Sequence, residues 1–352
     1  MKDTSVAITQ NDKDSQAIQS RFELLLSSLP NFVDPSVPLG KDATANVLVN
    51  KWGEAASSDL DHIEIADQFD MLDVERAAKT SGARFYFLRR DLARLNYALI
   101  TFALDYLRRR SFILIQPPYM LKREAIGGAV ILGDFEDVIY KIENEDLYLI
   151  GTSEHAIAAM HMGEILDGDA LPIRYAGISP CFRKEAGAHG KDTKGIFRVH
   201  QFEKVEQFVY CKPENSEREH KMLLENAEGF MQMLGIPYHV VLLSSGDMGK
   251  VASKTFDIEG WIPSQNNYRE LISCSNCTDF QARSLGIKYR EKAHEESKFL
   301  HTLNSTLVAT ERTLVAILEN CYRKDSRVIE IPKALVPYMD SQTEIAPIAC
   351  KE

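Results

Sequence analysis

The segment from Arg198 to Val209 constrains the fold most, because its side chains alternate in kind with the two-residue period of a β-strand. Charged and aromatic residues occupy every second position: Arg198, His200, Phe202, Lys204, Glu206 and Phe208. A face that mixes charges with aromatic rings suits neither a hydrophobic core nor a solvated surface. We therefore expect this strand to form the floor of a binding site, cationic near Arg198 and anionic near Glu206. The alternative is a ladder of ion pairs, each worth little energy.

A second strand, residues 173–183, precedes this one, and the polar segment EAGAHGKDTKG at 185–195 joins the two. Glycine lets a backbone approach a ligand closely, and lysine supplies positive charge, so this loop suits closure over a polyanion. An ordinary flexible surface loop has the same composition. The loop alone leaves both interpretations open.

The remaining pattern predicts an α+β fold. Leucines and aromatic residues recur every three or four positions over residues 91–110, which predicts an amphipathic helix. A strand at 112–116 follows and stops at Pro117 and Pro118. Further strands are predicted at 148–150, 240–243, 269–280 and 299–303, with a helix at 305–322. Without a regular βαβ alternation, these elements indicate an antiparallel sheet flanked by helices.

Composition excludes several classes of protein. The chain has 352 residues and a formal net charge of −10, which disfavours a nucleic-acid coat or a membrane-surface binder, although a local basic face for RNA stays possible. No apolar run approaches the roughly 18–20 residues of a membrane span, and the polar start is unlike a signal peptide. We therefore expect a cytoplasmic protein with no membrane partner.

Two common site signatures are missing. Cys274 and Cys277 form a single CxxC with no second pair to complete a tetrahedral site, so no zinc is expected. Neither GxxxxGK[ST] nor GxGxxG occurs after a strand. A bound nucleotide would therefore lie on an arginine-lined sheet.

Five elements in order carry a resemblance to class II aminoacyl-tRNA synthetases. FRKE at 182–185, the polar loop and FRVHQFEKVE at 197–206 resemble motif 2 of that class, and GKDTKGIFRVHQF at 190–202 is similar to the seryl-tRNA synthetase family in its archaeal or eukaryotic form. The helix and strand through Pro118 resemble motif 1, whose proline lies at a dimer interface. Residues 301–312 resemble motif 3, while TSE at 152–154 and ELIS at 270–273 match smaller elements of the site.

The resemblance implies that serine and ATP react to seryl-adenylate and pyrophosphate, and that serine then passes to tRNA(Ser). It implies an ATP-binding set of Arg183, Glu185, Arg198, Val199, Glu270, Ser273 and Arg312, of which Arg183, Glu270 and Arg312 are catalytic. It implies a serine-binding set of Thr152, Glu154, Arg183, Glu206, Asn304 and Thr306. Mg²⁺ would be held by Glu270 and Ser273, and a homodimer would form through motif 1. No general base is implied, since a carboxylate is already a nucleophile at neutral pH.

The expected domains are an N-terminal tail and linker at 1–45, a catalytic domain at 46–345 and a C-terminal tail at 346–352. The first twenty residues show no sustained period and are expected to lack stable structure. They are also too few for the two long helices of the tRNA-binding arm found in the resembling family. We expect the tail to be a remnant of that arm and transfer to tRNA to be weakened.

Two other functions remain open at this stage. One is a related ligase that passes seryl-adenylate to an acceptor other than tRNA. The other is a regulatory paralogue that binds its ligands without catalysis. The intact charges of Arg183, Glu206 and Arg312 argue against the second.

Overall fold

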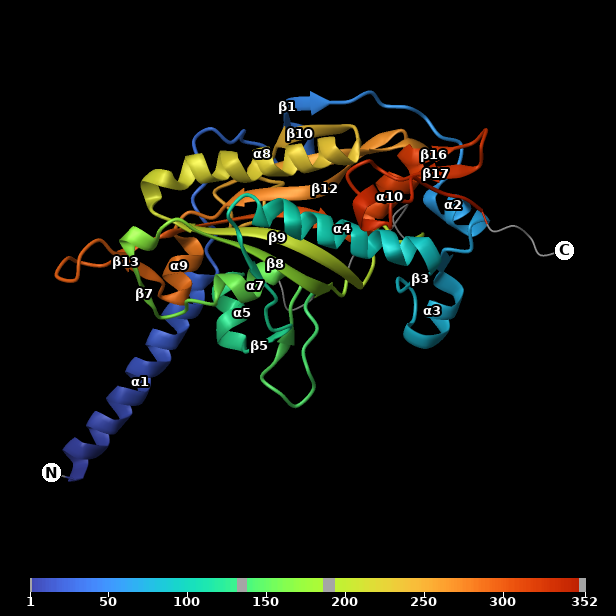
Figure 1. The fold of residues 1–352 in the computed structure, drawn as a ribbon. Helices are drawn as coiled ribbons and strands as arrows, with labels where there is room; N and C mark the ends of the chain where they lie inside the picture. The colour runs from blue at the N-terminus through green and yellow to red at the C-terminus, as the bar shows by residue number, and fades with distance from the viewer. Residues whose placement is uncertain (1, 132–137, 186–193, 348–352) are drawn as a thin grey trace.

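The fold, known from a computed structural model that describes residues 2–131, 138–185 and 194–347, is built on one eight-stranded sheet (Figure 1). Its strand order is β1–β10–β11–β12–β15–β9–β8–β4. The bounds are β1 Val47–Trp52, β4 Ile113–Ile115, β8 Ile173–Phe182, β9 Gln201–Cys211, β10 Tyr238–Leu242, β11 Lys254–Ile262, β12 Asn267–Asn276 and β15 His301–Ala309. Edge strand β4 runs parallel to β8, and the other neighbouring pairs are antiparallel. The predicted α+β antiparallel fold is confirmed.

Helices cover both faces of this sheet. One face packs against α4 (Arg90–Arg108), α8 (Ser216–Leu234) and α10 (Thr310–Cys321), and the other packs against α5 (Arg123–Ala129), α7 (Ser153–Ala158) and α9 (Phe280–Leu285). Strand β9 serves both layers: Val205 and Val209 belong to the first core, while Phe208 and Tyr210 belong to the second. The predicted alternation therefore sends even-numbered side chains of β9 away from α4.

Short elements complete the described chain. They are α2 His62–Gln68, β2 Leu72–Asp73, α3 Val74–Ser81, β3 Phe87–Leu88, β5 Met120–Leu121, β6 Tyr148–Leu149, β7 Ile165–Asp167, β13 Lys288–Arg290, β14 Lys298–Phe299, β16 Tyr322–Arg323, β17 Val328–Glu330 and β18 Glu344–Ile345. Five 3₁₀ turns lie at 43–45, 168–170, 213–215, 263–265 and 336–338. Among the described residues, no helix is long and apolar enough to cross a bilayer.

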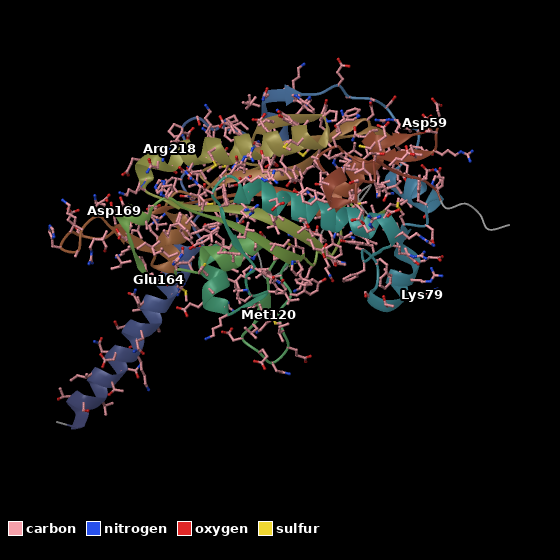
Figure 2. All side chains as sticks on the ribbon, in the orientation of Figure 1. Asp59, Lys79, Met120, Glu164, Asp169 and Arg218 are labelled. Atoms are coloured by element: carbon pink, nitrogen blue, oxygen red, sulfur yellow. The ribbon has the colours of Figure 1, made fainter. Side chains whose placement is uncertain are left out.

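The N-terminal expectation was wrong, because Lys2–Ser27 forms a 26-residue helix, α1. It projects from the body of the protein, and its described side chains stand in solvent (Figures 1 and 2). The segment contains neither glycine nor proline, which permits a helix. Its apolar residues are too scattered to form a stripe, and the period therefore gave no helical signal.

The linker after α1 packs against the body of the protein. The side-chain amide of Asn31 donates to the carbonyl oxygens of Val251 (3.0 Å) and Cys277 (2.8 Å). The backbone N–H groups of Asn31 and Asp34 donate to Lys250 and Ser253. The linker thus lies along residues 250–253.

One predicted helix boundary was wrong. Residues 305–309 continue strand β15, and α10 begins only at Thr310. These five residues are buried, and from Ser305 to Ala309 the strand pairs with β9 across a bulge. A continuous buried run of this kind fits a central strand as well as a helix, so its period could not decide.

Candidate active site

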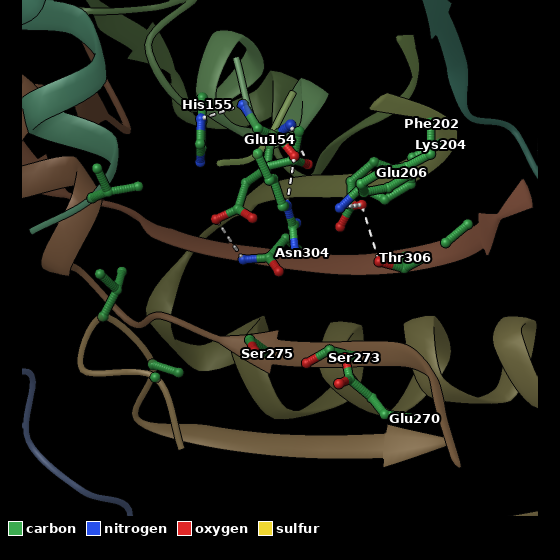
Figure 3. Close-up of a pocket in the computed structure, with 18 of the residues that line it drawn as sticks. Glu154, His155, Phe202, Lys204, Glu206, Glu270, Ser273, Ser275, Asn304 and Thr306 are labelled. Atoms are coloured by element: carbon green, nitrogen blue, oxygen red, sulfur yellow. Dashed lines mark hydrogen bonds and ion pairs between the residues drawn. The ribbon is translucent and has the colours of Figure 1, made fainter. Parts of the chain in front are cut away.

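A cavity of about 510 Å³ opens on the even-numbered face of β9 (Figure 3). Its volume falls within the range of small-molecule sites. Strands β9, β12 and β15, the start of α7 and residues 248–252 supply its wall. All twelve residues that the resemblance assigned line it: Thr152, Glu154, Arg183, Glu185, Arg198, Val199, Glu206, Glu270, Ser273, Asn304, Thr306 and Arg312.

One end of the cavity holds a buried ion pair. Lys204 and Glu206 lie two residues apart on the same face of β9, and Nζ lies 2.5 Å from Oε2. Their side chains are only 7% and 1% exposed. The hydroxyl of Thr306, on neighbouring β15, donates to the same carboxylate oxygen at 3.3 Å. Burial raises the pKa of Glu206, although the lysine opposes this effect.

Glu154 lies beside this pair at the start of α7. The hydroxyl of Thr152 caps the helix by accepting the Glu154 N–H at 3.2 Å, which fixes the position of the glutamate. Its Oε1 accepts from the amides of Gln281 and Asn304, each at 3.1 Å. Burial, together with repulsion from Glu206, raises the pKa of Glu154 to about 7. Figure 3 shows Glu154 and Glu206 on opposite sides of the space above β15.

Arg183 lies between the two ends, directly after β8. Its Nε donates to the carbonyl oxygen of Gly151 at 3.2 Å, and its guanidinium carbon lies 5.4 Å from the centre of the Phe202 ring. The Arg183 N–H donates to the His200 carbonyl, and the His200 Nδ1 bonds the Arg183 carbonyl; both distances are 2.9 Å. These two bonds keep the ends of β8 and β9 together and so fix the arginine.

The other end of the cavity is lined by arginines with acidic partners. Arg198 pairs with Glu185 at 2.9 Å. Arg312, at the start of α10, donates to the Glu270 carbonyl at 2.9 Å and lies 3.4 Å from its carboxylate. Partial desolvation acts to raise the pKa of Glu270, but the arginines outweigh it and hold that pKa below its ordinary value.

An aromatic ring completes this cationic end. Phe197 is buried, and the guanidinium carbons of Arg269 and Arg312 lie 4.7 Å and 5.2 Å from its ring centre. A ring with flanking guanidinium groups suits a planar, electron-rich ligand such as a nucleobase.

Three carboxyl groups gather on the adjacent strands β11 and β12. Asp257 pairs in register with Ser273, and Glu259 pairs with Glu270. Desolvation and the charge of Glu270 raise the pKa of Asp257, and its Oδ1 is buried without a hydrogen bond. Such an arrangement is short of positive charge.

The predicted floor needs one correction. Regular strand geometry begins at Gln201, so the alternation holds from Phe202 through Phe208 but not at Arg198. Residues 198–200 bend, and both Arg198 and Val199 reach the cavity as a result. Most of the predicted polar loop, residues 186–193 with His189 among them, lies outside the described residues.

Sequence reasoning missed several contributors. Lys204 was placed on the correct face but not recognised as the partner of Glu206, although their spacing of two residues was the available signal. Gln281 and Asp257 gave no local signal, because their neighbours in the site are distant in sequence. Cys274 and Cys277 are buried, and Cys277 lines the cavity. Within the described ranges, no group of three His, Cys, Asp or Glu residues is placed to hold a metal ion.

The antiparallel sheet, with its arginine-lined cavity between motif-like strands, defines the catalytic core of a class II tRNA synthetase. The family model for the tRNA synthetase class II core domain (G, H, P, S and T) matches residues 138–321. The chain is 56% identical over 348 residues to a serine–tRNA ligase of Nitrosopumilus maritimus, covering 98% of this chain and 82% of that one.

Solved structures agree. Seryl-tRNA synthetase from Pyrococcus horikoshii, complexed with ATP, is 46% identical with a TM-score of 0.93, covering 97% of this chain and 81% of that one. The cytoplasmic enzyme of Naegleria fowleri, in complex with AMP, is 40% identical with a TM-score of 0.90, covering 98% and 83%. The chain belongs to the seryl-tRNA synthetase family.

Proposed function

We propose that this chain joins L-serine to ATP, forming seryl-adenylate and pyrophosphate, and then transfers serine to tRNA(Ser). The observation that carries the proposal is a single cavity with an arginine-lined end and a carboxylate-lined end, spanned by Arg183. The names of the three relatives described above, which are serine–tRNA ligases, support this choice. Neither they nor the site geometry supports a different acceptor.

In the first step, an oxygen of the serine carboxylate bonds to the α-phosphorus, and the bond to the bridging oxygen of pyrophosphate breaks. Arg183 would hold both anions together, because a planar guanidinium fork binds carboxylate and phosphate bidentately. Arg198 and Arg312 neutralise the departing pyrophosphate. Catalysis therefore consists of positioning and charge stabilisation, with no proton removed from the nucleophile.

The other roles follow the lining of each end. Glu185 accepts a hydrogen bond from the amino group of the adenine base, and Val199 packs beside the base. At the serine end, Glu206 and Glu154 face the substrate ammonium, with Thr152 holding the latter in place. Thr306 would bond the substrate hydroxyl and Asn304 would complete the serine-binding set; their side chains bond Glu206 and Glu154, respectively.

Mg²⁺ fits the carboxyl group of Glu270 and the hydroxyl of Ser273. The unpaired Oδ1 of Asp257 and its closeness to Glu270 leave this part of the wall in need of positive charge. Mg²⁺ is commonly held by one or two carboxylates and completed by phosphate oxygens. The ion would supply charge neutralisation for the triphosphate.

We also propose a homodimer formed through motif 1. Strand β4 ends the sheet, and its side chains Ile113 and Leu114 are 55% and 41% exposed. An apolar edge strand of this kind is suited to burial against another chain. Pro118 is exposed and Pro117 is buried, which makes Pro118 the proline available for such an interface. A monodisperse, fully active monomer would contradict this proposal.

The proposed catalytic domain spans residues 46–345. Strand β1 begins at Val47 as one edge of the sheet, and β18 ends at Ile345. A cytoplasmic location follows from the proposed role in charging tRNA.

Pyrophosphate exchange tests the proposal directly. Serine should drive incorporation of labelled pyrophosphate into ATP, whereas alanine and threonine should drive little. Addition of tRNA(Ser) should then yield seryl-tRNA. A folded chain without serine-dependent exchange would overturn the proposed activity and favour a binding role.

A further inference from the structure

A buried histidine–carboxylate pair, His62 and Glu319, lies outside the cavity. His62 begins α2 and Glu319 lies on α10, 257 residues later; Nδ1 and Oε1 are 3.2 Å apart, with side chains 7% and 0% exposed. The same Oε1 accepts the His62 N–H at 3.0 Å, and Oε2 accepts the Ser264 N–H at 3.0 Å. Glu319 therefore accepts three hydrogen bonds from two segments that are distant in sequence.

The other ring nitrogen of His62 fixes its tautomer. The Ile196 N–H donates to Nε2 at 3.3 Å, so this nitrogen carries a lone pair and the hydrogen lies on Nδ1, directed at Glu319. If Nε2 also carried a hydrogen, its N–H would point at the N–H of Ile196, and neither could accept. A Cβ added at Gly195, which has a φ of +70°, would lie 1.9 Å from Nε2. The backbone thus passes the ring at a distance that only glycine allows.

The segment bonded to His62, residues 195–198, contributes side chains to the cationic end of the cavity. Ile196 directly precedes Phe197 and Arg198, and Glu319 lies seven residues after Arg312 on α10, about two helical turns. Phe197 and Arg312 also contact each other. One buried pair therefore connects the two elements that present these groups to the cavity, while His62 itself does not line it.

We propose that His62, as the neutral Nδ1–H tautomer bonded to Glu319, is a positioning residue for the ATP end of the site. It acts by holding residues 195–198 against α2 and α10, and so fixes Phe197 and Arg198 before ATP binds. This inference rests on the proposed ATP-dependent function. The serine end is anchored separately by Thr152, Gln281 and Lys204 and should not depend on it.

Two matched substitutions separate the two bonds of the ring. In His62→Gln, the longer amide places an oxygen near the former Nε2, where it can accept the Ile196 N–H. In His62→Asn, the shorter amide places its NH₂ near the former Nδ1 and can reach only Glu319. His62→Ala removes both bonds. His161→Ala is the control, since His161 also pairs with a carboxylate, Glu164, but lies outside the cavity lining.

Two readouts apply to every variant. The first is amide hydrogen–deuterium exchange in peptides covering Ile196, and the second is the KM for ATP and for serine in pyrophosphate exchange. We expect faster amide exchange and a roughly three- to tenfold higher KM for ATP in H62A and H62N, the range for loss of one buried hydrogen bond. H62Q should resemble the wild type in both, and the KM for serine should stay constant throughout.

Two results would overturn the inference. H62Q behaving like H62N would show that the bond to Ile196 is not what matters. A parallel rise of both KM values in all His62 variants would show a general structural role. A wild-type chain without exchange activity would refute the proposed function instead. In that case, comparing the hydrogen–deuterium exchange rate of the Ile196 amide among the wild type and the His62 variants would still decide whether His62 holds residues 195–198. Equilibrium binding of ATP to the same proteins would decide whether this contact affects the affinity for ATP.

Discussion

The two ends of the cavity neutralise their charges in different ways. At the cationic end, ion pairs are partly open to water: Arg312 and Glu270 have side chains 16% and 51% exposed. At the serine end, Lys204 and Glu206 are 7% and 1% exposed. Pairs of the first kind can exchange a carboxylate for a phosphate at little cost, whereas a buried pair is part of the folded structure. We infer that the proposed ATP end is adaptable, whereas the proposed serine end is fixed by the fold before a substrate arrives.

Arg183 belongs to both ends, so its replacement should have the largest effect. Arg183→Lys keeps the charge but loses the bidentate fork and the Nε bond to Gly151. We expect kcat/KM for pyrophosphate exchange to fall by roughly 10²–10³, as for loss of one preorganised transition-state donor. Thermal denaturation should show a folded protein. Arg218→Lys, at an exposed site on α8, is the control, and a loss below tenfold for Arg183→Lys would refute the bridging role.

Replacing the glutamate of each ion pair, Glu206 or Glu270, compares how much the pair at each end of the cavity contributes to stability. Glu206→Gln leaves Lys204 charged and buried, which should lower the free energy of unfolding by roughly 3–5 kcal/mol. Glu270→Gln should lower it by less than about 1 kcal/mol, since that carboxylate is half exposed. Denaturant unfolding measures both. Equal losses would abolish the distinction between a fixed end and an adaptable one.

A double substitution separates stability from binding at the serine end. Lys204→Met combined with Glu206→Gln removes the unpaired charge, and much of the lost stability should return. The KM for serine should nevertheless stay raised at least about tenfold, because the ammonium has lost a charged partner. Recovery of serine affinity together with stability would show that Glu206 serves the fold alone.

Thr306→Val should give a smaller, selective effect. The substitution keeps the shape and removes the hydroxyl that donates to Glu206. We expect kcat/KM for serine to fall about tenfold, the contribution of one hydrogen bond to a charged group. Alanine lacks the hydroxyl partner, so its low rate should change little and the preference for serine should narrow. An equal fall for both substrates would contradict a role in hydroxyl recognition.

The two ends also differ in how well the sequence predicted them. Period two along β9 correctly placed Lys204 and Glu206 on one face, because a strand carries its own geometry in the sequence. Arg198 was placed by the same rule and reaches the cavity for another reason, a bend before the strand. Local periodicity cannot reveal where a strand stops, and register with neighbouring strands decides this.

Contacts between distant segments were beyond prediction by pattern. Gln281 meets Glu154 across 127 residues, and His62 meets Glu319 across 257. The ordered motifs supplied the assigned cavity residues outside the predicted strand at 198–209, such as Arg183, Glu270 and Arg312. Residues 305–309, STLVA, were assigned to the helix because so short a run does not distinguish the end of a central strand from the start of a helix.

The pH dependence of stability should have opposite signs at the two ends. Glu154 titrates near pH 7 in the folded chain and near 4.5 when unfolded. Between these values Glu154 holds more protons in the folded state, so its contribution to stability should fall as pH rises, by at most about 1.4 kcal/mol per unit. Glu154→Gln, which mimics the protonated acid, should remove this slope between pH 5 and 7.

Glu270 provides the contrast, since its pKa lies below the ordinary value. Its contribution is present above pH 4.5 and is lost as pH falls through the lower folded pKa. Wild type and Glu270→Gln should therefore converge in acid, whereas wild type and Glu154→Gln should diverge as pH rises toward 7. Unfolding free energies of the three proteins at pH 3, 3.5, 4, 5, 6, 7 and 8 test both slopes. Slopes of the same sign would mean that the serine end does not hold its carboxylate in a desolvated site, and the proposed difference between the ends would fail.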